Sequence, residues 1–98
     1  MADIPVLSPA EVQQHLQELD SWELVDGNRI RKLFTFADFA GAMAFMNRLA
    51  PVAEELHHHP EWSNVYNRVT IELTTHEADG LSRYDFDFAK RADELAEV

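Results

Sequence analysis

The stretch ELHHHPEWSNVYNRVTIELTTH, residues 55–76, decides the fold. It starts at the end of a predicted helix, and Pro60 prevents that helix from continuing beyond the histidine run. A short strand, 62–65, is predicted next, and a turn at Tyr66-Asn67 connects it to a second strand. Apolar residues alternate with polar ones in that second strand, as expected when one face is buried: Val69, Ile71 and Leu73. A helix therefore leads directly into a hairpin.

The first part of the chain predicts another helix and another hairpin. The helix covers residues 8–19, because Ser8 is a good N-cap and Glu11 completes a capping box with it. Two extended runs within residues 22–36 flank the turn signal Asp26-Gly27-Asn28. Three basic side chains on the second run are interpreted as the solvent-exposed face of a strand: Arg29, Arg31 and Lys32.

A long helix is predicted from about Asp38 to His57, and Pro51 should bend it because proline removes a backbone hydrogen bond. Its predicted buried face consists of Phe39, Ala42, Met43, Met46, Leu49, Ala50, Ala53 and Leu56. A last helix, 83–97, is capped by Ser82, with an inward face of Phe86, Ala89, Ala92, Leu95 and Ala96. Hairpins joined by helices imply an α+β fold, an antiparallel sheet with helices on one face.

Length and composition limit the class of protein. The 98 residues, 1–98, are expected to form one domain, and the apolar fraction of 46% is that of a globular protein. The absence of cysteine excludes disulfides, thiolate chemistry and cysteine-based zinc sites. A net charge of −10 argues against nucleic acid binding. No run reaches the roughly 18 apolar residues of a membrane span, and the start lacks the features of a signal peptide. We therefore expect a soluble, cytoplasmic protein without a membrane partner.

Four of the five histidines stand at the ends of predicted elements. His57, His58 and His59 end the long helix, and His76 follows the last strand. Rigid elements can hold such side chains around one cleft. Imidazole can both donate and accept a proton near neutral pH, so two or three rings facing one pocket could act as general acid and base.

Two other interpretations of the histidines remain open. Histidine at a helix C-terminus is favoured by the helix macrodipole without any function, and consecutive helical residues point about 100° apart. Alternatively, His58 or His59 could form a metal site with His76 and Asp85, as two histidines and one carboxylate. No HExxH or comparable local spacing supports that metal site.

Several of these residues stand at fixed spacing: Glu54, three residues, His58-His59-Pro60, five residues, Tyr66, nine residues, His76, eight residues and Asp85. The pattern resembles the signature of the pterin-4a-carbinolamine dehydratases, and the segments HHPEW, NVYNRV, THE and GLS are also typical of that family. The resemblance covers residues 20–97 and implies a four-stranded antiparallel sheet with three helices on one face. Pro51 and the third histidine, His57, depart from the family pattern and put the local helix geometry and the pocket polarity in doubt.

The resemblance also implies a reaction, the dehydration of 4a-hydroxytetrahydropterin to quinonoid dihydropterin. This step recycles the pterin cofactor of aromatic amino acid hydroxylases. Hydroxide leaves poorly, so an acid must protonate it while a base removes a proton from a ring nitrogen. The implied chemistry uses no metal and no organic cofactor. Members of the family also act as dimerisation cofactors for a transcription regulator, which is the alternative function, and they form homodimers or homotetramers.

The resemblance assigns roles to individual residues. Catalysis would fall to His58, His59 and His76, with His58 and His76 as the acid–base pair and His59 also orienting the substrate. The substrate would be contacted by His57, His58, His59, Thr74, Thr75, His76 and Glu77. Glu54 and Asp85 would orient histidines by hydrogen bonds, while Pro60 and Trp62 would shape the pocket wall. Because His58 and His76 lie at element ends, we expect their substitution to leave the fold intact.

Overall fold

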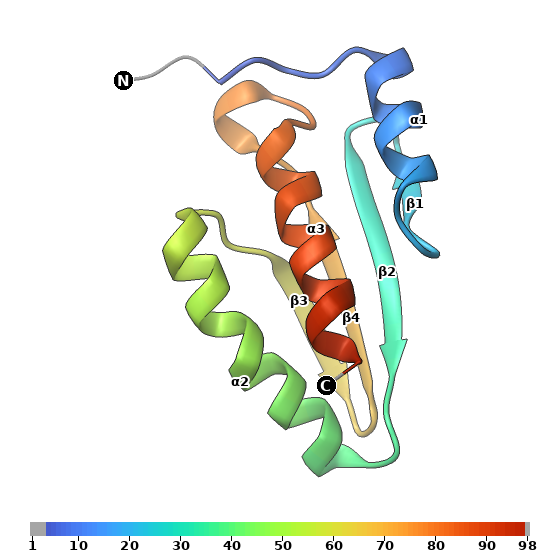
Figure 1. Ribbon diagram of the computed structural model, residues 1–98, viewed down its shortest axis with the longest axis vertical. Helices are drawn as coiled ribbons and strands as arrows, with labels where there is room; N and C mark the ends of the chain where they lie inside the picture. The colour runs from blue at the N-terminus through green and yellow to red at the C-terminus, as the bar shows by residue number, and fades with distance from the viewer. Residues whose placement is uncertain (1–3, 98) are drawn as a thin grey trace.

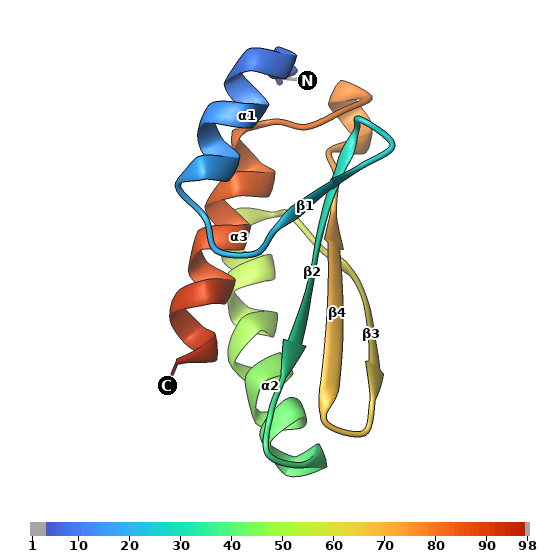
Figure 2. The same cartoon turned by 90° about the vertical axis from the view of Figure 1, so that its right-hand side faces the viewer.

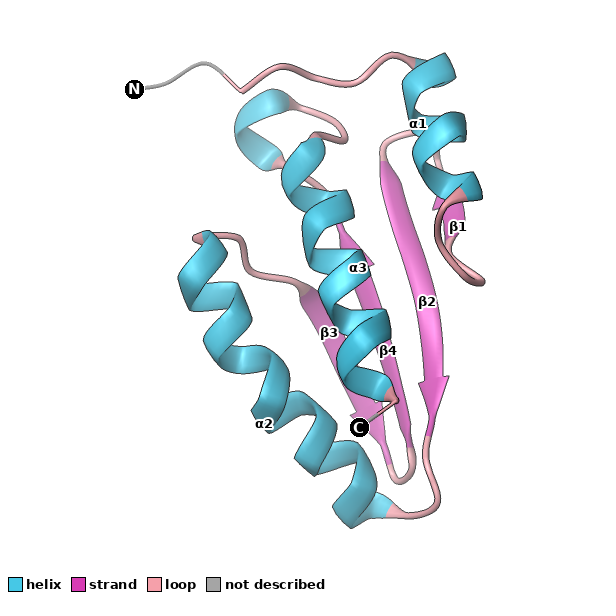
Figure 3. Cartoon of the chain, in the orientation of Figure 1, coloured by secondary structure: helices cyan, strands magenta, loops and turns pink. Residues whose placement is uncertain are grey.

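The computed structural model describes residues 4–97, and its elements follow the predicted order (Figures 1 and 3). They are α1 (Pro9–Gln17), β1 (Glu23–Val25), β2 (Arg29–Thr35), α2 (Phe39–Leu56), β3 (Glu61–Val65), β4 (Arg68–Leu73), the short 3-10 helix η1 (His76–Ala78) and α3 (Arg83–Ala96). All neighbouring strands are antiparallel, and their order in the sheet is β1-β2-β4-β3. The predicted α+β fold is therefore confirmed.

The three α-helices cover one face of the sheet and leave the other face open (Figure 2). Strand alternation sends every second side chain of β2 and β4 toward the helices, so Phe34 lies opposite Val69 in the register and Ile30 opposite Leu73. Phe86, Ala89 and Ala92 of α3 are buried against this layer as predicted, and Phe88 joins them. Each large apolar side chain buried here stabilises the fold by about 1.5–3 kcal/mol.

The predicted buried face of α2 is partly wrong. Phe39 is 50% exposed and Ala50 is also exposed, whereas Phe45 and Val52, which the prediction omitted, are buried. Phe45 packs on the rings of Phe34 and Phe36, with centroids 4.8 and 4.9 Å away. Apolar residues lie on most sides of this helix, so their spacing alone did not determine which side meets the sheet.

The interpretation of the basic residues of β2 is right for two of them and wrong for Lys32. Arg29 and Arg31 pair with Glu72 on the open face of the sheet. Lys32 points to the helix side, where it is only 13% exposed and its Nζ lies 2.8 Å from Asp93. Trp22 donates its indole N–H to the same carboxylate. The alternation of side chains along a strand puts Lys32 on the face of its buried neighbours, and the partner on α3 satisfies its charge.

None of the helices formed by the described residues has the length and apolarity needed to span a bilayer.

Candidate active site

The end of α2 separates the three consecutive histidines. His57 adopts the left-handed conformation, with φ 51° and ψ 40°, and the N–H of His58 bonds back to the carbonyl of Ala53 at 3.0 Å. A left-handed residue, usually glycine, commonly ends a helix in this way. In a residue with a Cβ, such as His57, this conformation is sterically destabilised. Because the backbone turns at His57, the three imidazoles reach different surroundings.

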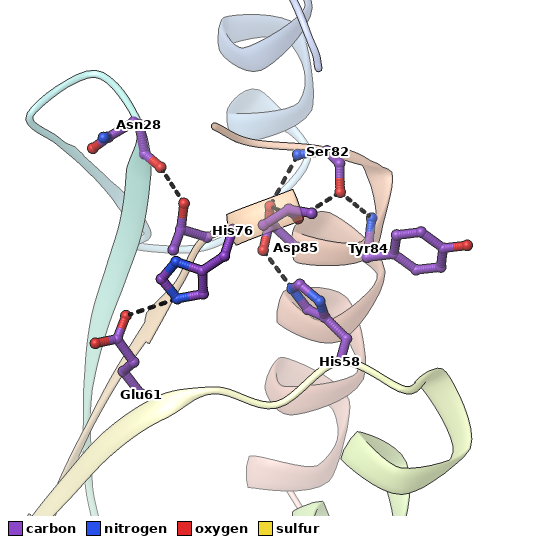
Figure 4. A network of polar contacts seen from close by, with 9 residues as sticks. Asn28, His58, Glu61, His76, Ser82, Tyr84 and Asp85 are labelled. Atoms are coloured by element: carbon purple, nitrogen blue, oxygen red, sulfur yellow. Dashed lines mark hydrogen bonds and ion pairs between the residues drawn. The ribbon is translucent and has the colours of Figure 1, made fainter. Parts of the chain in front are cut away.

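His58 points inward and is held by a buried carboxylate. It is 8% exposed, and its Nε2 lies 2.6 Å from Oδ1 of Asp85, which is fully buried (Figure 4). The other oxygen of Asp85 accepts hydrogen bonds from Thr75 Oγ1 at 2.8 Å and from the Ser82 N–H at 2.9 Å. The expectation that His58 can be removed without affecting the fold therefore does not hold, because its loss leaves a buried carboxylate without one of its donors.

Local sequence explains why Asp85 stands there. Ser82 is the N-cap of α3, and Asp85 is the third helical residue, so the two form a capping box. The carboxylate that caps the helix on one side receives His58 on the other. The start of α3 and the end of α2, which are far apart in sequence, are joined in this way.

His59 faces solvent and pairs with Glu54, one turn back in the chain. The two side chains are both largely exposed, and His59 Nε2 lies 2.5 Å from Glu54 Oε2. This hydrogen bond, together with the charge of His59, holds the pKa of Glu54 below its usual value. The Glu54 carboxylate therefore stays ionised to a lower pH than a free glutamate would.

His76 directly follows Thr75 in sequence and occupies the first position of η1, with its ring facing Glu61 (Figure 4). Its side chain is 80% exposed, and its Nε2 stands 3.9 Å from Glu61 Oε2. The segment that carries it is anchored at both ends. Thr74 Oγ1 donates to the Asn28 carbonyl at 2.7 Å, and Thr75 pairs with Gly80 through the backbone.

Two hollows share Thr75 as a lining residue. The larger, of about 400 Å³, is lined by Ile4, Glu55, Leu56, His57, His58, Thr75, Glu77 and Tyr84. The smaller, of about 210 Å³, is lined by Asn28, Arg29, Thr74, Thr75, His76, Asp79 and Gly80. His58 lines the larger hollow and His76 the smaller one, so each hollow has an imidazole in its wall.

Comparison with known proteins identifies the relatives of this chain. The family model described as pterin 4 alpha carbinolamine dehydratase matches residues 5–95. The chain belongs to the pterin-4a-carbinolamine dehydratase family.

Individual relatives cover nearly the whole chain. It is 48% identical to a Rhizobium meliloti protein over 93% of this chain and 88% of that one. It is 55% identical to a Novosphingobium aromaticivorans protein over 86% of this chain and 88% of that one. Both are provisionally named pterin-4-alpha-carbinolamine dehydratase.

Two solved structures are similar as well. A Brucella melitensis protein described as a transcriptional coactivator/pterin dehydratase superposes with a TM-score of 0.91 at 41% identity, covering 94% of this chain and 99% of that one. A pterin dehydratase-like protein, identified as a RuBisCO assembly factor of the alpha-carboxysome, superposes with a TM-score of 0.68 at 29% identity. The match covers 79% of this chain and 90% of that one.

In this dehydratase family member, the residues expected at the site divide into separate groups. The larger hollow brings together His57, His58, Thr75 and Glu77, while Thr74 and His76 line the smaller one. His59 and Glu54 line neither hollow, and the same is true of Pro60. Trp62 instead borders a shallow depression with Ser63 and Thr70. The candidate metal set does not assemble: within residues 4–97 no three His, Asp or Glu side chains are grouped closely enough to hold an ion.

Sequence reasoning missed four residues of the larger hollow: Ile4, Glu55, Leu56 and Tyr84. Tyr84 could have been suspected, because it directly precedes Asp85 in the sequence; in the structure its ring lies 6.0 Å from that of His58. Ile4 carries no such signal, since it reaches the larger hollow from the N-terminal segment, far away in sequence.

Replacing His57 with glycine should stabilise the protein. Glycine adopts the left-handed conformation without the Cβ clash, so we expect a gain of about 0.5–1 kcal/mol in the free energy of unfolding. Urea unfolding measures this gain. His57→Ala is the matched control, because it removes the imidazole but keeps the Cβ. Equal midpoints for the two variants would contradict the explanation.

Proposed function

We propose that this protein dehydrates 4a-hydroxytetrahydropterin, releasing quinonoid dihydropterin and water, with histidines as acid and base. The observation that supports this most is the His58–Asp85 pair at the edge of the larger hollow. A carboxylate that accepts from one imidazole nitrogen orients the ring and fixes which nitrogen carries the hydrogen. Both residues belong to the family signature, and relatives named as dehydratases share about half of the sequence.

The proposed reaction needs only proton transfers. The bond between C4a and the hydroxyl oxygen breaks as an acid protonates the departing hydroxide, and water leaves. A base removes the proton of the adjacent ring nitrogen, and the electron pair left there forms the new carbon–nitrogen double bond. No electrons are exchanged with another molecule, so protons balance the equation without a metal or an organic cofactor. An aromatic amino acid hydroxylase would supply the substrate, and a reductase would consume the product.

His58 and His76 are the proposed acid–base pair. The pterin would lie across Thr75, with His57 and Glu77 around the part near His58 and Thr74 beside the part near His76. His59 would bind or orient the substrate from the outer edge, with Glu54 holding its ring. Each role is a contact to be tested by substitution.

A coupled assay tests the proposal directly. An aromatic amino acid hydroxylase generates the 4a-hydroxy adduct, and its decay is followed with and without this protein. We expect faster decay after the spontaneous rate has been subtracted, with the same rate after treatment with a chelator. Decay at the spontaneous rate would contradict the proposed function. Activity that is lost on chelation and restored by zinc or iron would instead favour a metal mechanism.

A second candidate function is supported by the Brucella melitensis structure, whose description includes a transcriptional coactivator. In this case the chain would bind a helical segment of a transcription regulator as a dimerisation cofactor. A pull-down and the dehydration assay on one preparation separate the two functions. The retained histidines favour dehydration over the adaptor role, and partner capture without any dehydration would reverse that order.

We also expect a homo-oligomer, at least a dimer. The outer edges of the sheet belong to β1 and β3, and β3 is the longer of the two, with Val65 60% exposed. Unpaired strand edges favour pairing with another chain. The charge of −10 opposes association, but salt screens it over about 8 Å at physiological ionic strength. Light scattering at micromolar concentration should give at least twice the chain mass, and a mass near 11.3 kDa would contradict the expectation.

A further inference from the structure

We infer that Thr75 and Ser82 are positioning residues, whose hydroxyls hold Asp85 so that His58 exchanges protons with the substrate through Nδ1. The identity of the substrate rests on the proposed function, whereas the protonation pattern of His58 does not. Ser82, Thr75 and Asp85 are all buried, so water has little access to the contacts among them. Neither Ser82 nor Thr75 Oγ1 has an evident role in the proton transfers of the reaction itself.

The contacts form one continuous chain (Figure 4). Ser82 Oγ lies 2.6 Å from Thr75 Oγ1, which lies 2.8 Å from Asp85 Oδ2. On the other side of the carboxylate, Oδ1 lies 2.6 Å from His58 Nε2. Two backbone groups close the chain: the Ser82 N–H donates to Asp85 Oδ2, and the Tyr84 N–H donates to Ser82 Oγ.

Only one assignment of donors and acceptors is possible in this series of hydrogen bonds. A carboxylate only accepts, so Thr75 must give its single hydroxyl hydrogen to Asp85. Thr75 can then only accept from Ser82, whose own oxygen already accepts from a backbone N–H. By the same rule, the nitrogen of His58 that faces Asp85 must carry a hydrogen. Every donor in the chain has one acceptor, and the neutral ring is fixed as the Nε2-protonated tautomer.

The remaining ring nitrogen is then the one available for chemistry. His58 Nδ1 has no hydrogen-bond partner within residues 4–97, and across those residues the one fully buried side-chain polar atom without a partner is Arg48 Nε. Nδ1 therefore keeps access to the hollow that His58 lines. With Asp85 fixing the opposite nitrogen, Nδ1 carries the lone pair when the ring is a base and the exchangeable proton when it is an acid.

Nitrogen NMR on the wild-type protein tests the tautomer without any activity measurement. The protein is labelled with ¹⁵N in the imidazole rings, and the His58 signals are assigned by their loss in His58→Gln. At a pH where the ring is neutral, we expect a proton on Nε2 and none on Nδ1. A proton on Nδ1 would overturn the inference, even if the protein proves to be an active dehydratase. If the protein shows the expected tautomer but has no dehydratase activity, the inferred hydrogen-bond network stands and only the proposed function is rejected.

Two substitutions of Thr75 test its positioning role. Thr75→Val keeps the shape but removes the hydroxyl, and we expect kcat to fall about 10–100-fold with little change in KM, together with a smaller fraction of the Nε2-protonated tautomer. Thr75→Ser restores the hydroxyl, so it should restore both kcat and the fraction of the Nε2-protonated tautomer. Thr74→Val removes a neighbouring hydroxyl that does not belong to this hydrogen-bond network, and it should leave the His58 tautomer unchanged. If Thr75→Val keeps the wild-type tautomer and kcat, the positioning role is wrong.

Discussion

His58→Ala and His76→Ala should each lower the rate of pterin dehydration by about 10²–10⁴-fold at saturating substrate, the usual cost of losing a positioned acid or base. The two histidines line different hollows, so neither is expected to replace the other. The spontaneous reaction sets the lowest rate that can be measured and must be subtracted first.

The two variants differ in their expected effect on the fold. His76 is exposed and its removal should leave stability unchanged, whereas His58 is a hydrogen-bond donor to a buried carboxylate. His58→Gln is therefore the better test at that position, because its amide can still donate to Asp85 but does not exchange protons near neutral pH. His15→Ala serves as the control for loss of an imidazole outside both hollows. A near-full rate for His58→Gln or His76→Ala would show that its assigned role is wrong.

The elements of the fold could be predicted because their signals are local. The alternation of Val69, Ile71 and Leu73, the capping box of Ser8 and Glu11, and the cap at Ser82 each lie within a few residues, and the structure confirms all three. Propensity and capping act over such short distances.

The errors arise where distant partners decide the outcome. Lys32 is mostly shielded from solvent because Asp93 pairs with it from α3, 61 positions along the chain. Phe45 faces the sheet because Phe34 and Phe36 leave room for its ring there. Neither partner can be recognised from the sequence next to the residue concerned.

Only some of the residues expected at the candidate site line the two hollows, and their arrangement could not be predicted from the sequence. The family signature named the four residues of the two histidine–carboxylate pairs, and the structure joins His58 to Asp85 and His59 to Glu54. The left-handed backbone of His57 is what turns one ring inward and the next outward. A left-handed residue other than glycine is rare, so the sequence gives no reason to expect the chain to turn at this position.

Asp85→Ala should lower the free energy of unfolding by about 3–5 kcal/mol, because each buried donor that loses its acceptor costs about 1–3 kcal/mol. The carboxylate accepts from His58, Thr75 and the Ser82 backbone, so its loss leaves three buried donors unsatisfied and removes one half of the capping box of α3. Urea unfolding measures the change. Asp87→Ala is the matched control, because that carboxylate lies on the same helix but is exposed. A loss no larger than that of the control would contradict the role assigned to Asp85.

Asp85→Asn separates the structural effect from the chemical one. The amide has the shape of the carboxylate, and its oxygen can still accept from Thr75 and the Ser82 N–H. Its NH₂ group must then face His58 Nε2 and donate, so the neutral ring has to carry its hydrogen on Nδ1 instead. We expect a stability loss well below that of Asp85→Ala, but a dehydration rate reduced about as far as in His58→Gln. A variant that keeps both its stability and its rate would show that the tautomer of His58 does not matter, and that Asp85 is no more than a helix cap.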